Sequence, residues 1–388
     1  MRLRLVLIFL LGLIGLTAQS QEGAQRPKVG LALSGGSAHG LAHIGVLKYM
    51  EELGIEVDYI TGTSMGSVVG GLYSMGFTAD EIADIAEELD WDQVMSNRIP
   101  LYEIAPIEKP YHGRIPLSAL WQGSSFRLPR GFIRGQKLDL VISKVYCPAR
   151  HVDDFDDFHI PFRCVAVDIE DGSVDVLDKG YVGDAIRASM AIPTVFPPKE
   201  LNGRLYVDGG LIRNFPVEEA KDMGADIVIG VYVGSMKSSR DELFSMFDIL
   251  KQSASMGNLL DSDKQKSLAD ILIEPDVKDE GTFDFDQSKK FIQLGYEAAK
   301  AQSDMFIKLA AKLKNFPPKG PRPARLDYPD VLRLTEINIP DADKAYEKMI
   351  LNRIDFEEGF ALPLDRIEES LSLIYGTKNF SKTAYSFY

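Results

Sequence analysis

The sequence predicts an α/β fold, a three-layer α/β/α domain built on a mainly parallel sheet. From residue 28 to about residue 233, short apolar runs alternate with amphipathic segments that carry apolar residues at helical spacing. Strands that alternate with helices in this way are typical of a parallel sheet covered by helices. The runs are apolar throughout, as in Ile227-Val228-Ile229, which indicates strands buried on both faces of the sheet.

The predicted elements follow in chain order. A strand at 29–33 runs into a Gly-rich turn, and a helix at 41–53 ends at Gly54, a residue type favoured after the last turn of a helix. A second strand, at 57–60, precedes a helix from residue 67 towards residue 75. Further strands are expected at 162–167, 205–207 and 227–233.

Two segments interrupt this alternation. Residues 92–160 are less regular and carry four prolines between positions 100 and 116, so they form either a lid over a site or a surface excursion. Residues 315–330 carry five prolines among basic and polar residues, which excludes a helix and predicts a semi-rigid linker. Beyond this linker, composition predicts a strand, two helices and a final strand, at 331–339, 342–351, 364–375 and 380–388.

Composition and charge exclude some classes of function. The chain of 388 residues is 45% hydrophobic and 26% charged, as expected for a folded protein of one large and one small domain. Its 43 basic residues are outnumbered by 57 acidic ones, giving a formal net charge of −14. Because nucleic-acid binding depends on clustered Lys and Arg, this balance argues against a nucleic-acid partner.

The N-terminus reads as a secretory signal peptide over residues 1–20. Arg2 and Arg4 form a charged region, residues 5–16 form an apolar run, and Ala18-Gln19-Ser20 offers small residues for cleavage before Gln21. The run is shorter than the roughly 20 residues of a membrane span. We therefore expect export, to the periplasm, the outer membrane or the medium.

The chain has two cysteines, Cys147 and Cys164. Export to an oxidising compartment would permit a disulfide between them. Cys164 stands in an apolar run that looks like a buried strand, so two unpaired, partly buried thiols are the alternative. Neither their spacing nor their neighbours suggest a metal site.

The sequence Gly62-Thr63-Ser64-Met65-Gly66 matches G-x-S-x-G, in which a sharp strand-to-helix turn exposes a serine Oγ above the edge of a sheet. Gly62 and Gly66 allow the close backbone approach that such a turn requires. The predicted elements agree with this, since a strand precedes the motif and a helix follows it. That helix would point its N-terminal amides at Ser64. The motif thus predicts Ser64 as a nucleophile, with an ordinary tight turn as the alternative.

A Gly-rich loop at 34–40 follows the first predicted strand. It does not match the dinucleotide-binding G-x-G-x-x-G motif, because position 37 is Ser. It lacks the Lys and Ser/Thr that a phosphate-binding P-loop places after its last glycine. An oxyanion hole needs only backbone N–H groups exposed by small residues, and this loop can supply them. The oxyanion donors are expected from Gly35, Gly36 and Ser37 in this loop, and from Met65.

Asp208-Gly209-Gly210 follows the predicted strand 205–207, and an α/β sheet commonly presents site residues at the carboxyl ends of its strands. An ordinary Asp-Gly-Gly turn is the alternative. The five histidines, at 39, 43, 112, 151 and 159, all precede Asp208, so a Ser-Asp-His triad in that chain order cannot form. A direct Ser64–Asp208 dyad can, with Asp208 taking the Ser64 proton as general base. His39 and His43 share a helix face, but further metal ligands are not suggested.

These motifs resemble the patatin-like phospholipase family. Residues 29–45 look like its first strand, oxyanion loop and helix, 61–76 like its nucleophile turn, and 206–210 like its Asp-Gly motif. The segment 188–193, Ala-Ser-Met-Ala-Ile-Pro, is similar to a family segment that packs near the site. The resemblance covers roughly residues 28–310. It implies a patatin-like hydrolase domain with a Ser-Asp dyad, acting on phospholipids or other lipid esters at a membrane surface without metal or organic cofactor.

One position departs from the family pattern. The family loop usually reads G-G-G-x-[RK]-G, whereas this chain has Gly35-Gly36-Ser37-Ala38-His39-Gly40. His39 replaces a permanent charge by one that titrates near neutral pH. We therefore expect weaker or pH-dependent stabilisation of the oxyanion or headgroup, with the same class of reaction.

The C-terminal residues 331–388 resemble part of a POTRA domain, the β-α-α-β-β module that precedes outer-membrane barrels. Residues 362–367 and the run from Leu371 to Phe380 carry this resemblance. It implies a partial β-α-α-β module and an outer-membrane barrel as a partner. A complete module would need a strand after Tyr388, so the chain is expected to be a shortened member of the patatin–POTRA–barrel group or one without its barrel.

The reaction class expected is ester hydrolysis through an acyl-enzyme on Ser64. Two alternatives stay open. The same machinery would serve an acyltransferase or thioesterase, and an inert hydrolase fold would leave a secretion or binding module.

Overall fold

The computed structural model describes residues 25–104, 109, 120–122, 125–127, 131–234, 246–278, 280–317, 319–337, 339, 350, 359–377, 380, 382–385 and 387. The predicted signal peptide, residues 1–20, lies outside the described residues. Of the helix predicted at 342–351, only residue 350 is described, and it is helical. Within the described part of the chain, every helix is too short or too polar to cross a bilayer.

A mixed sheet of eight strands occupies the centre of the described fold, in the order β10-β9-β1-β2-β5-β8-β7, with β6 also paired to β5. The strands from β10 to β5 run parallel, whereas β6, β7 and β8 are antiparallel to their neighbours. The strand bounds are β1 Val29–Leu33, β2 Tyr59–Thr63, β5 Phe162–Asp168, β6 Val174–Leu177, β7 Lys199–Leu201, β8 Arg204–Asp208, β9 Ile227–Val231 and β10 Ile271–Ile273.

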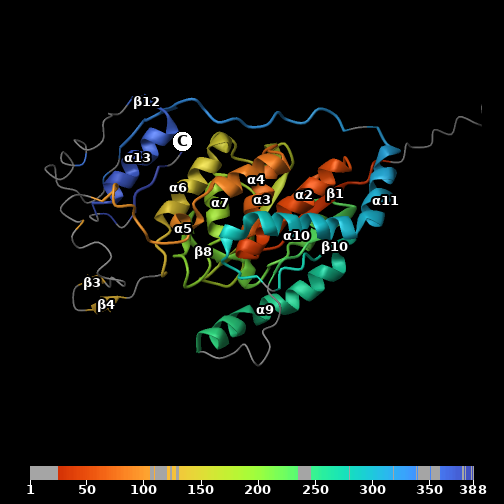
Figure 1. The fold of residues 1–388 in the computed structure, drawn as a ribbon, viewed down its shortest axis with the longest axis horizontal. Coiled ribbons are helices and arrows are strands. Elements are labelled where there is room, and N and C mark those ends of the chain that lie inside the picture. Colours follow the sequence, from red (N-terminus) through yellow and green to blue (C-terminus); the bar gives the residue numbers. More distant parts are fainter. Residues whose placement is uncertain are drawn as a thin grey trace, which may run out of the picture.

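Helices cover both faces of this sheet, so the predicted three-layer α/β/α architecture is confirmed (Figure 1). The side chains of β1 divide between the layers: Leu31 and Leu33 join the larger core, whereas Ala32 packs with Phe215 and Val217 on the opposite face. One layer contains α2 (Ala42–Glu52), α3 (Met65–Ser74), α4 (Ala79–Glu88), α10 (Ser288–Ala301) and α11 (Ser303–Lys314). The other contains α8 (Val217–Asp222) and α9 (Met246–Leu268).

The second strand begins two residues later and ends three residues later than the sequence predicts. We expected residues 57–60, but β2 begins at Tyr59 and continues to Thr63. Thr61, Gly62 and Thr63 do not form an apolar run, which hid the end of the strand. Their backbone is nevertheless paired with β1 on one side and β5 on the other. The strand therefore ends directly before Ser64.

The strand that leads to Asp208 belongs to a tight hairpin. β7 and β8 are joined by Asn202 and Gly203, both with positive φ, 51° and 77°. Asn-Gly at two left-handed positions is typical of a type I′ turn, whose twist matches that of the strands it joins. The hairpin places β8 antiparallel to β5.

Residues 92–160 contain α5 (Trp91–Val94), β3 (Leu120–Gln122), β4 (Ser125–Arg127), α6 (Gln136–Val145) and the 3₁₀ turn at Cys147–Ala149 in their described parts. Helix α7 (Val182–Ser189) follows β6. Both cysteines are unpaired and buried, Cys147 in the 3₁₀ turn and Cys164 in β5.

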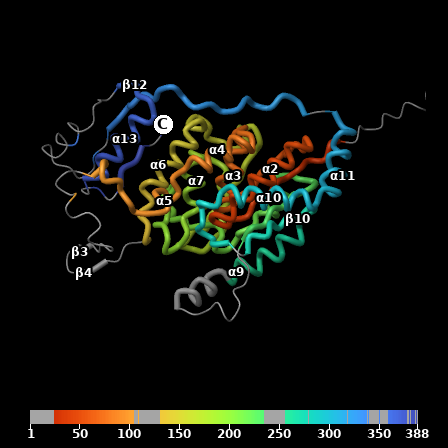
Figure 2. The backbone as a smooth tube through the Cα atoms, viewed as in Figure 1, coloured from red at the N-terminus to blue at the C-terminus, as the bar shows by residue number. Residues whose placement is uncertain are grey.

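The Pro-rich segment runs along the surface of the domain (Figure 2). It is not helical, as its prolines predict, and specific contacts hold it. Lys319 Nζ lies 2.7 Å from the carboxylate of Asp58, which also receives Arg26 Nη1 at 2.7 Å and the N–H of Val29 at 2.7 Å. Further along, Tyr328 packs edge-on against Phe77.

The C-terminal segment forms a short antiparallel pair and one helix in its described part. β11 (Leu332–Arg333) pairs with β12 (Ala361–Leu362), and α13 (Leu364–Tyr375) matches the predicted helix at 364–375. The strand predicted at 331–339 is thus much shorter than expected. The strand predicted at 380–388 is wrong for its described residues, which pair with no other strand. The reason lies at Thr383, whose main-chain N–H and carbonyl bond to the side chain of Gln136.

Candidate active site

Ser64 occupies a strained turn between β2 and α3, with φ 51° and ψ −124°. A non-glycine residue at positive φ is uncommon and persists only when its surroundings hold it there. Tight packing does so: a Cβ added to Gly62 would lie 2.6 Å from the carbonyl oxygen of Gly66, and one added to Gly66 would lie 2.3 Å from that of Leu33. Both glycines are therefore required by close backbone approach.

The side chains of Ser64 and Asp208 meet in a buried contact. Ser64 Oγ donates a hydrogen bond of 2.7 Å to Asp208 Oδ2, and each residue is only 6% exposed. The second carboxylate oxygen, Oδ1, accepts the N–H of Gly210 at 2.7 Å. Burial raises the pKa of Asp208 to about 6, while the hydrogen bonds from Ser64 and Gly210 act in the opposite direction. At neutral pH Asp208 is ionised and can accept the Ser64 proton.

Ser189, at the end of α7, completes the support of Ser64. Its hydroxyl accepts the main-chain N–H of Ser64 at 2.9 Å and donates to the carbonyl oxygen of Val165 at 2.6 Å. Ser189 is fully buried. Sequence reasoning placed its segment near the site by family resemblance but gave Ser189 no role, and its spacing in the chain carries no signal for one.

The Gly-rich loop lies beside Ser64, and Ser37 in it has a positive φ of 49°. Its first glycine corrects the sequence prediction, because the N–H of Gly35 donates to the carbonyl oxygen of Asn214 at 3.1 Å and is engaged within the fold. Asn214 also donates from Nδ2 to the carbonyl oxygen of Gly35 at 3.2 Å. Gly35 instead provides room, since a Cβ there would lie 3.0 Å from the Cβ of Ser64.

Three main-chain donors remain next to the nucleophile. Among the described residues, the N–H groups of Gly36, Ser37 and Met65 have no hydrogen-bond acceptor. Met65 begins α3, so its N–H belongs to the first turn, where helix amides have no partner in the helix itself. Unpaired amides beside a nucleophile are the groups that bind a developing oxyanion. Gly40 closes the loop onto this helix, since a Cβ there would lie 2.4 Å from Met65 Cγ.

His39 and His43 both bond to main-chain carbonyl oxygens. His39 Nε2 lies 3.0 Å from the carbonyl oxygen of Glu280, and its ring packs 5.4 Å from that of Phe291. His43 is fully buried, with Nε2 2.7 Å from the carbonyl oxygen of Ser34. Burial lowers the pKa of His43 to about 4, so it is neutral and donates from Nε2. In the described part of the chain, no three His, Cys, Asp or Glu side chains gather as metal ligands would.

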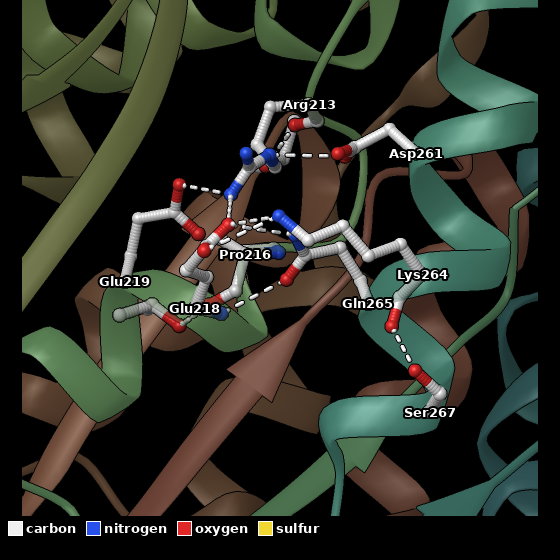
Figure 3. A network of polar contacts seen from close by, with 10 residues as sticks. Arg213, Pro216, Glu218, Glu219, Asp261, Lys264, Gln265 and Ser267 are labelled. Carbon is white, nitrogen blue, oxygen red and sulfur yellow. Dashed lines mark hydrogen bonds and ion pairs between the residues drawn. The ribbon is translucent and has the colours of Figure 1, made fainter.

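The loop after Asp208 is fixed by an ionic cluster (Figure 3). Arg213 Nη1 lies 2.7 Å from Glu219 Oε1 on α8, and Arg213 Nε lies 2.9 Å from Asp261 Oδ2 on α9. The carbonyl oxygen of Arg213 accepts the hydroxyl of Thr63, the residue before Ser64, at 3.0 Å. Arg213 and Asn214 thus connect the loop of Asp208 to both other loops of the site. Sequence reasoning missed both residues.

An apolar cavity opens beside Met65, with about 540 Å³ of empty volume counted together with the space at its mouth. Every described residue that lines it is hydrophobic. Helices α5 and α6 contribute part of the wall, so the described part of residues 92–160 is more than a surface excursion. The lining residues are Leu41, Ile44, Met65, Val68, Val69, Leu72, Ile82, Ile85, Ala86, Leu89, Trp91, Val94, Leu138, Val141, Ile142, Val145 and Met190.

Residues 31–221 match the model of the family described as patatin-like phospholipase. The chain is 35% identical over 211 residues to lysophospholipase NTE1 of Candida albicans, covering 54% of this chain and 13% of that protein. It is 30% identical over 295 residues to lysophospholipase NTE1 of Kluyveromyces lactis, covering 69% of this chain and 18% of that protein.

The chain therefore spans less than a fifth of the length of these two relatives. Among solved structures, that of VipD from Legionella pneumophila aligns with a TM-score of 0.41 and 15% identity, covering 73% of this chain and 68% of that one.

Proposed function

We propose that this protein, whose residues 31–221 match the patatin-like phospholipase family, is a serine lipid acyl hydrolase that acts through a Ser64–Asp208 dyad. The observation that carries the proposal is the 2.7 Å hydrogen bond from Ser64 Oγ to the buried carboxylate of Asp208. A carboxylate hydrogen-bonded to a serine hydroxyl can serve as its general base.

The reaction proceeds in two halves. Asp208 Oδ2 takes the proton of Ser64 as Oγ bonds to the ester carbonyl carbon, and the N–H groups of Gly36, Ser37 and Met65 bind the oxyanion that forms. The carbon–oxygen bond to the alcohol then breaks, and Asp208 returns the proton to the departing alcohol. A water molecule, deprotonated by Asp208, then attacks the acyl carbon. The bond from that carbon to Ser64 Oγ breaks, Asp208 returns the proton to Oγ, and the fatty acid leaves.

The substrate class follows from the cavity. An acyl group esterified to Ser64 lies next to Met65, which lines a cavity whose described walls are hydrophobic side chains, and burying each methylene there is favourable by about 0.8 kcal/mol. The acyl chain of a phospholipid or lysophospholipid fits such a site. The similarity to two proteins named lysophospholipase NTE1 supports this choice.

We propose further that the enzyme is exported and works at a membrane surface. Support for export comes from Arg2, Arg4 and the apolar run that follows them. Support for an outer-membrane barrel as partner comes from the POTRA-like residues 362–367 and the run from Leu371 to Phe380. N-terminal sequencing of the mature protein tests export, and a first residue of Met1 would contradict it.

The experiment that tests the proposed reaction compares the wild type with Ser64→Ala and Asp208→Asn on lysophospholipid, phospholipid and acyl-thioester substrates, with products identified by mass spectrometry. We expect free fatty acid from the lipids in the wild type and none above background in either variant. A fluorophosphonate should label Ser64 in the wild type. Hydrolysis retained by Ser64→Ala would overturn the proposal, and acyl transfer to an added alcohol faster than to water would identify an acyltransferase.

A further inference from the structure

Helix α6 has two faces with different partners. Leu138, Val141, Ile142 and Val145 recur at helical spacing and line the apolar cavity. Gln136 and Asp139 occupy the opposite face of the helix. The partners of that opposite face come from the far end of the sequence, around α13, which lies beside α6 (Figure 1).

The first of these contacts joins Gln136 to Thr383. Gln136 Nε2 donates to the carbonyl oxygen of Thr383 at 2.6 Å and contacts its hydroxyl at 2.9 Å, while Gln136 Oε1 accepts its N–H at 2.9 Å. Both residues are 8% exposed. One side-chain amide thus satisfies both main-chain groups of Thr383 in a buried place, where an unpaired polar group is destabilising.

The second contact joins Asp139 to Lys382. Lys382 Nζ lies 2.5 Å from Asp139 Oδ2, and Arg187 Nε of α7 lies 2.6 Å from Asp139 Oδ1. Asp139 therefore links the C-terminal segment to α6 and to α7 together. The Asp139 and Arg187 side chains are 12% and 5% exposed, so water screens this pair weakly.

The C-terminal residues 382–385 also contact α13. Thr383 Oγ1 donates to the carbonyl oxygen of Leu371 at 3.1 Å, and Tyr385 donates to Glu368 Oε1 at 3.2 Å. Lys144 near the end of α6 pairs with Asp365 on α13 at 2.5 Å. Residues 382–385 are thus held between α13 and α6.

From this arrangement we propose that the C-terminal segment sets the acyl-chain selectivity of the cavity, by holding α6 in place through Gln136–Thr383 and Asp139–Lys382. The proposal rests on the proposed function, since it concerns the acyl site of that reaction. The four residues act here as positioning residues, because their contacts hold α6 and none of them touches the reacting atoms. They are Gln136 and Asp139 on α6, and Lys382 and Thr383 in the C-terminal segment.

The effect depends on chain length. On this proposal a butyryl group on Ser64 stays near Met65, whereas a palmitoyl group is long enough to reach the wall that α6 contributes to the cavity. Loosening α6 withdraws part of the apolar wall from the long chain only. A loss of about 0.7–1.4 kcal/mol, one typical hydrogen bond, corresponds to a fall of about three- to tenfold in kcat/KM.

The test uses the full chain with the exchange Gln136→Met, which keeps side-chain length and helix propensity but removes the amide. The matched control is Gln293→Met on the exposed side of α10. Lys382→Met removes the second contact. Because the Lys382 side chain is half-exposed, this variant should fold even if Gln136→Met does not. Lys382→Arg keeps the charge. Each protein is assayed on palmitoyl and butyryl nitrophenyl esters, and amide hydrogen exchange is followed in α6.

We expect kcat/KM for the palmitoyl ester to fall about three- to tenfold in Gln136→Met and Lys382→Met, with the butyryl ester within about twofold of wild type. Hydrogen exchange should rise in α6 and stay unchanged in α2. Gln293→Met and Lys382→Arg should behave like the wild type. An unchanged palmitoyl-to-butyryl ratio in both Met variants of the contact would overturn the proposal. Failure of the proposed function would look different, as a wild type that hydrolyses neither ester and is not labelled at Ser64.

Discussion

Thr63 and Asp208 lie end to end along one edge of β5. Thr63 pairs with Val165, and Asp208 pairs with the next residue, Ala166. The opposite edge of β5 is occupied by β6, which faces residues 164–167. β2 and β8 therefore lie on the same edge of β5 and run towards each other, so that their carboxyl ends meet. Ser64 follows the first of these ends and Asp208 closes the second, which brings the nucleophile to its base.

The first prediction concerns the pH dependence of the reaction. Because only ionised Asp208 can take the Ser64 proton, and because burial raises its pKa to about 6, kcat/KM on an uncharged ester should rise with pH through about 6 and then level off. Initial rates across the acidic and neutral range measure this. A profile that stays flat through that region would contradict the assignment of Asp208 as the base.

The second prediction is that Asp208→Asn stabilises the fold while it abolishes activity. The folded-state pKa of Asp208, about 6, exceeds the ordinary 3.8. Ionisation of this carboxylate therefore lowers the free energy of unfolding as the pH rises from about 4 to above about 6, by up to about 3 kcal/mol. The Asn amide can still donate to Ser64 and accept from Gly210. We expect the free energy of unfolding to increase by about 1–3 kcal/mol near pH 8, with the gain lost below about pH 4.

Chemical denaturation at the two pH values measures this gain. Asp263→Asn, at an exposed position of α9, is the matched control and should change little. A loss of stability in Asp208→Asn at the higher pH would show that the carboxylate is not strained by its burial.

The third prediction concerns Ser189. Removing its hydroxyl in Ser189→Ala leaves the N–H of Ser64 and the carbonyl of Val165 without their partner, which should cost about 1–3 kcal/mol of stability. It should also lower kcat about 10- to 100-fold, because the strained turn at Ser64 loses one of its supports. Ser74→Ala is the control, since that buried hydroxyl bonds only within its own helix. Equal kcat in both variants would remove Ser189 from the support of the nucleophile.

The fourth prediction tests the close approach at the turn. Gly66→Ala places a Cβ 2.3 Å from the carbonyl oxygen of Leu33, and we expect a loss of at least about 1–3 kcal/mol with loss of activity. Gly257→Ala in helix α9 meets no neighbour and should instead add up to about 1 kcal/mol. Thermal unfolding of the two variants should shift in opposite directions. A stable and active Gly66→Ala would disprove the packing argument.

The fifth prediction concerns the acyl cavity. Ile85→Phe enlarges a half-buried side chain of α4 that lines the cavity, so kcat/KM should fall for palmitoyl esters and hold for butyryl esters. A fall of about tenfold corresponds to the loss of one or two buried methylenes of substrate. Ile307→Phe, at a residue 53% exposed on α11, is the same exchange away from the cavity. Equal losses on both esters would place the cavity outside the acyl site.

Much of the architecture could be predicted because burial leaves a local trace in the sequence. The strands β1, β5 and β9 are apolar runs, and the three-layer fold followed from their alternation with helices. The turn around Ser64 was also visible, since its glycines have fixed spacing. The end of β2 was missed because Thr and Gly form it. Backbone pairing with β1 and β5 holds these residues in the strand and leaves no local pattern in the sequence.

The contacts between distant segments could not be predicted. That Asp208 meets Ser64 depends on β8 entering antiparallel on the edge of β5 that β2 has vacated, which is a property of the sheet and not of either motif. The engagement of the Gly35 N–H depends on Asn214, and the missing strand near residue 383 depends on Gln136. His39 was expected to influence the oxyanion, but its Nε2 lies at the carbonyl oxygen of Glu280.

The carboxylate of Asp58 gives the molecule a mechanical property. It receives Arg26, ahead of β1, and Lys319, in the Pro-rich segment, so two stretches nearly three hundred residues apart are bound to one point. Tyr328 packs on Phe77 further along, so the Pro-rich segment is held at two points and not at one. A segment held at one point can still rotate about it, whereas one held at two points has a fixed direction between them. The chain is therefore already held against the hydrolase domain at Asp58 and at Phe77 before it reaches α13.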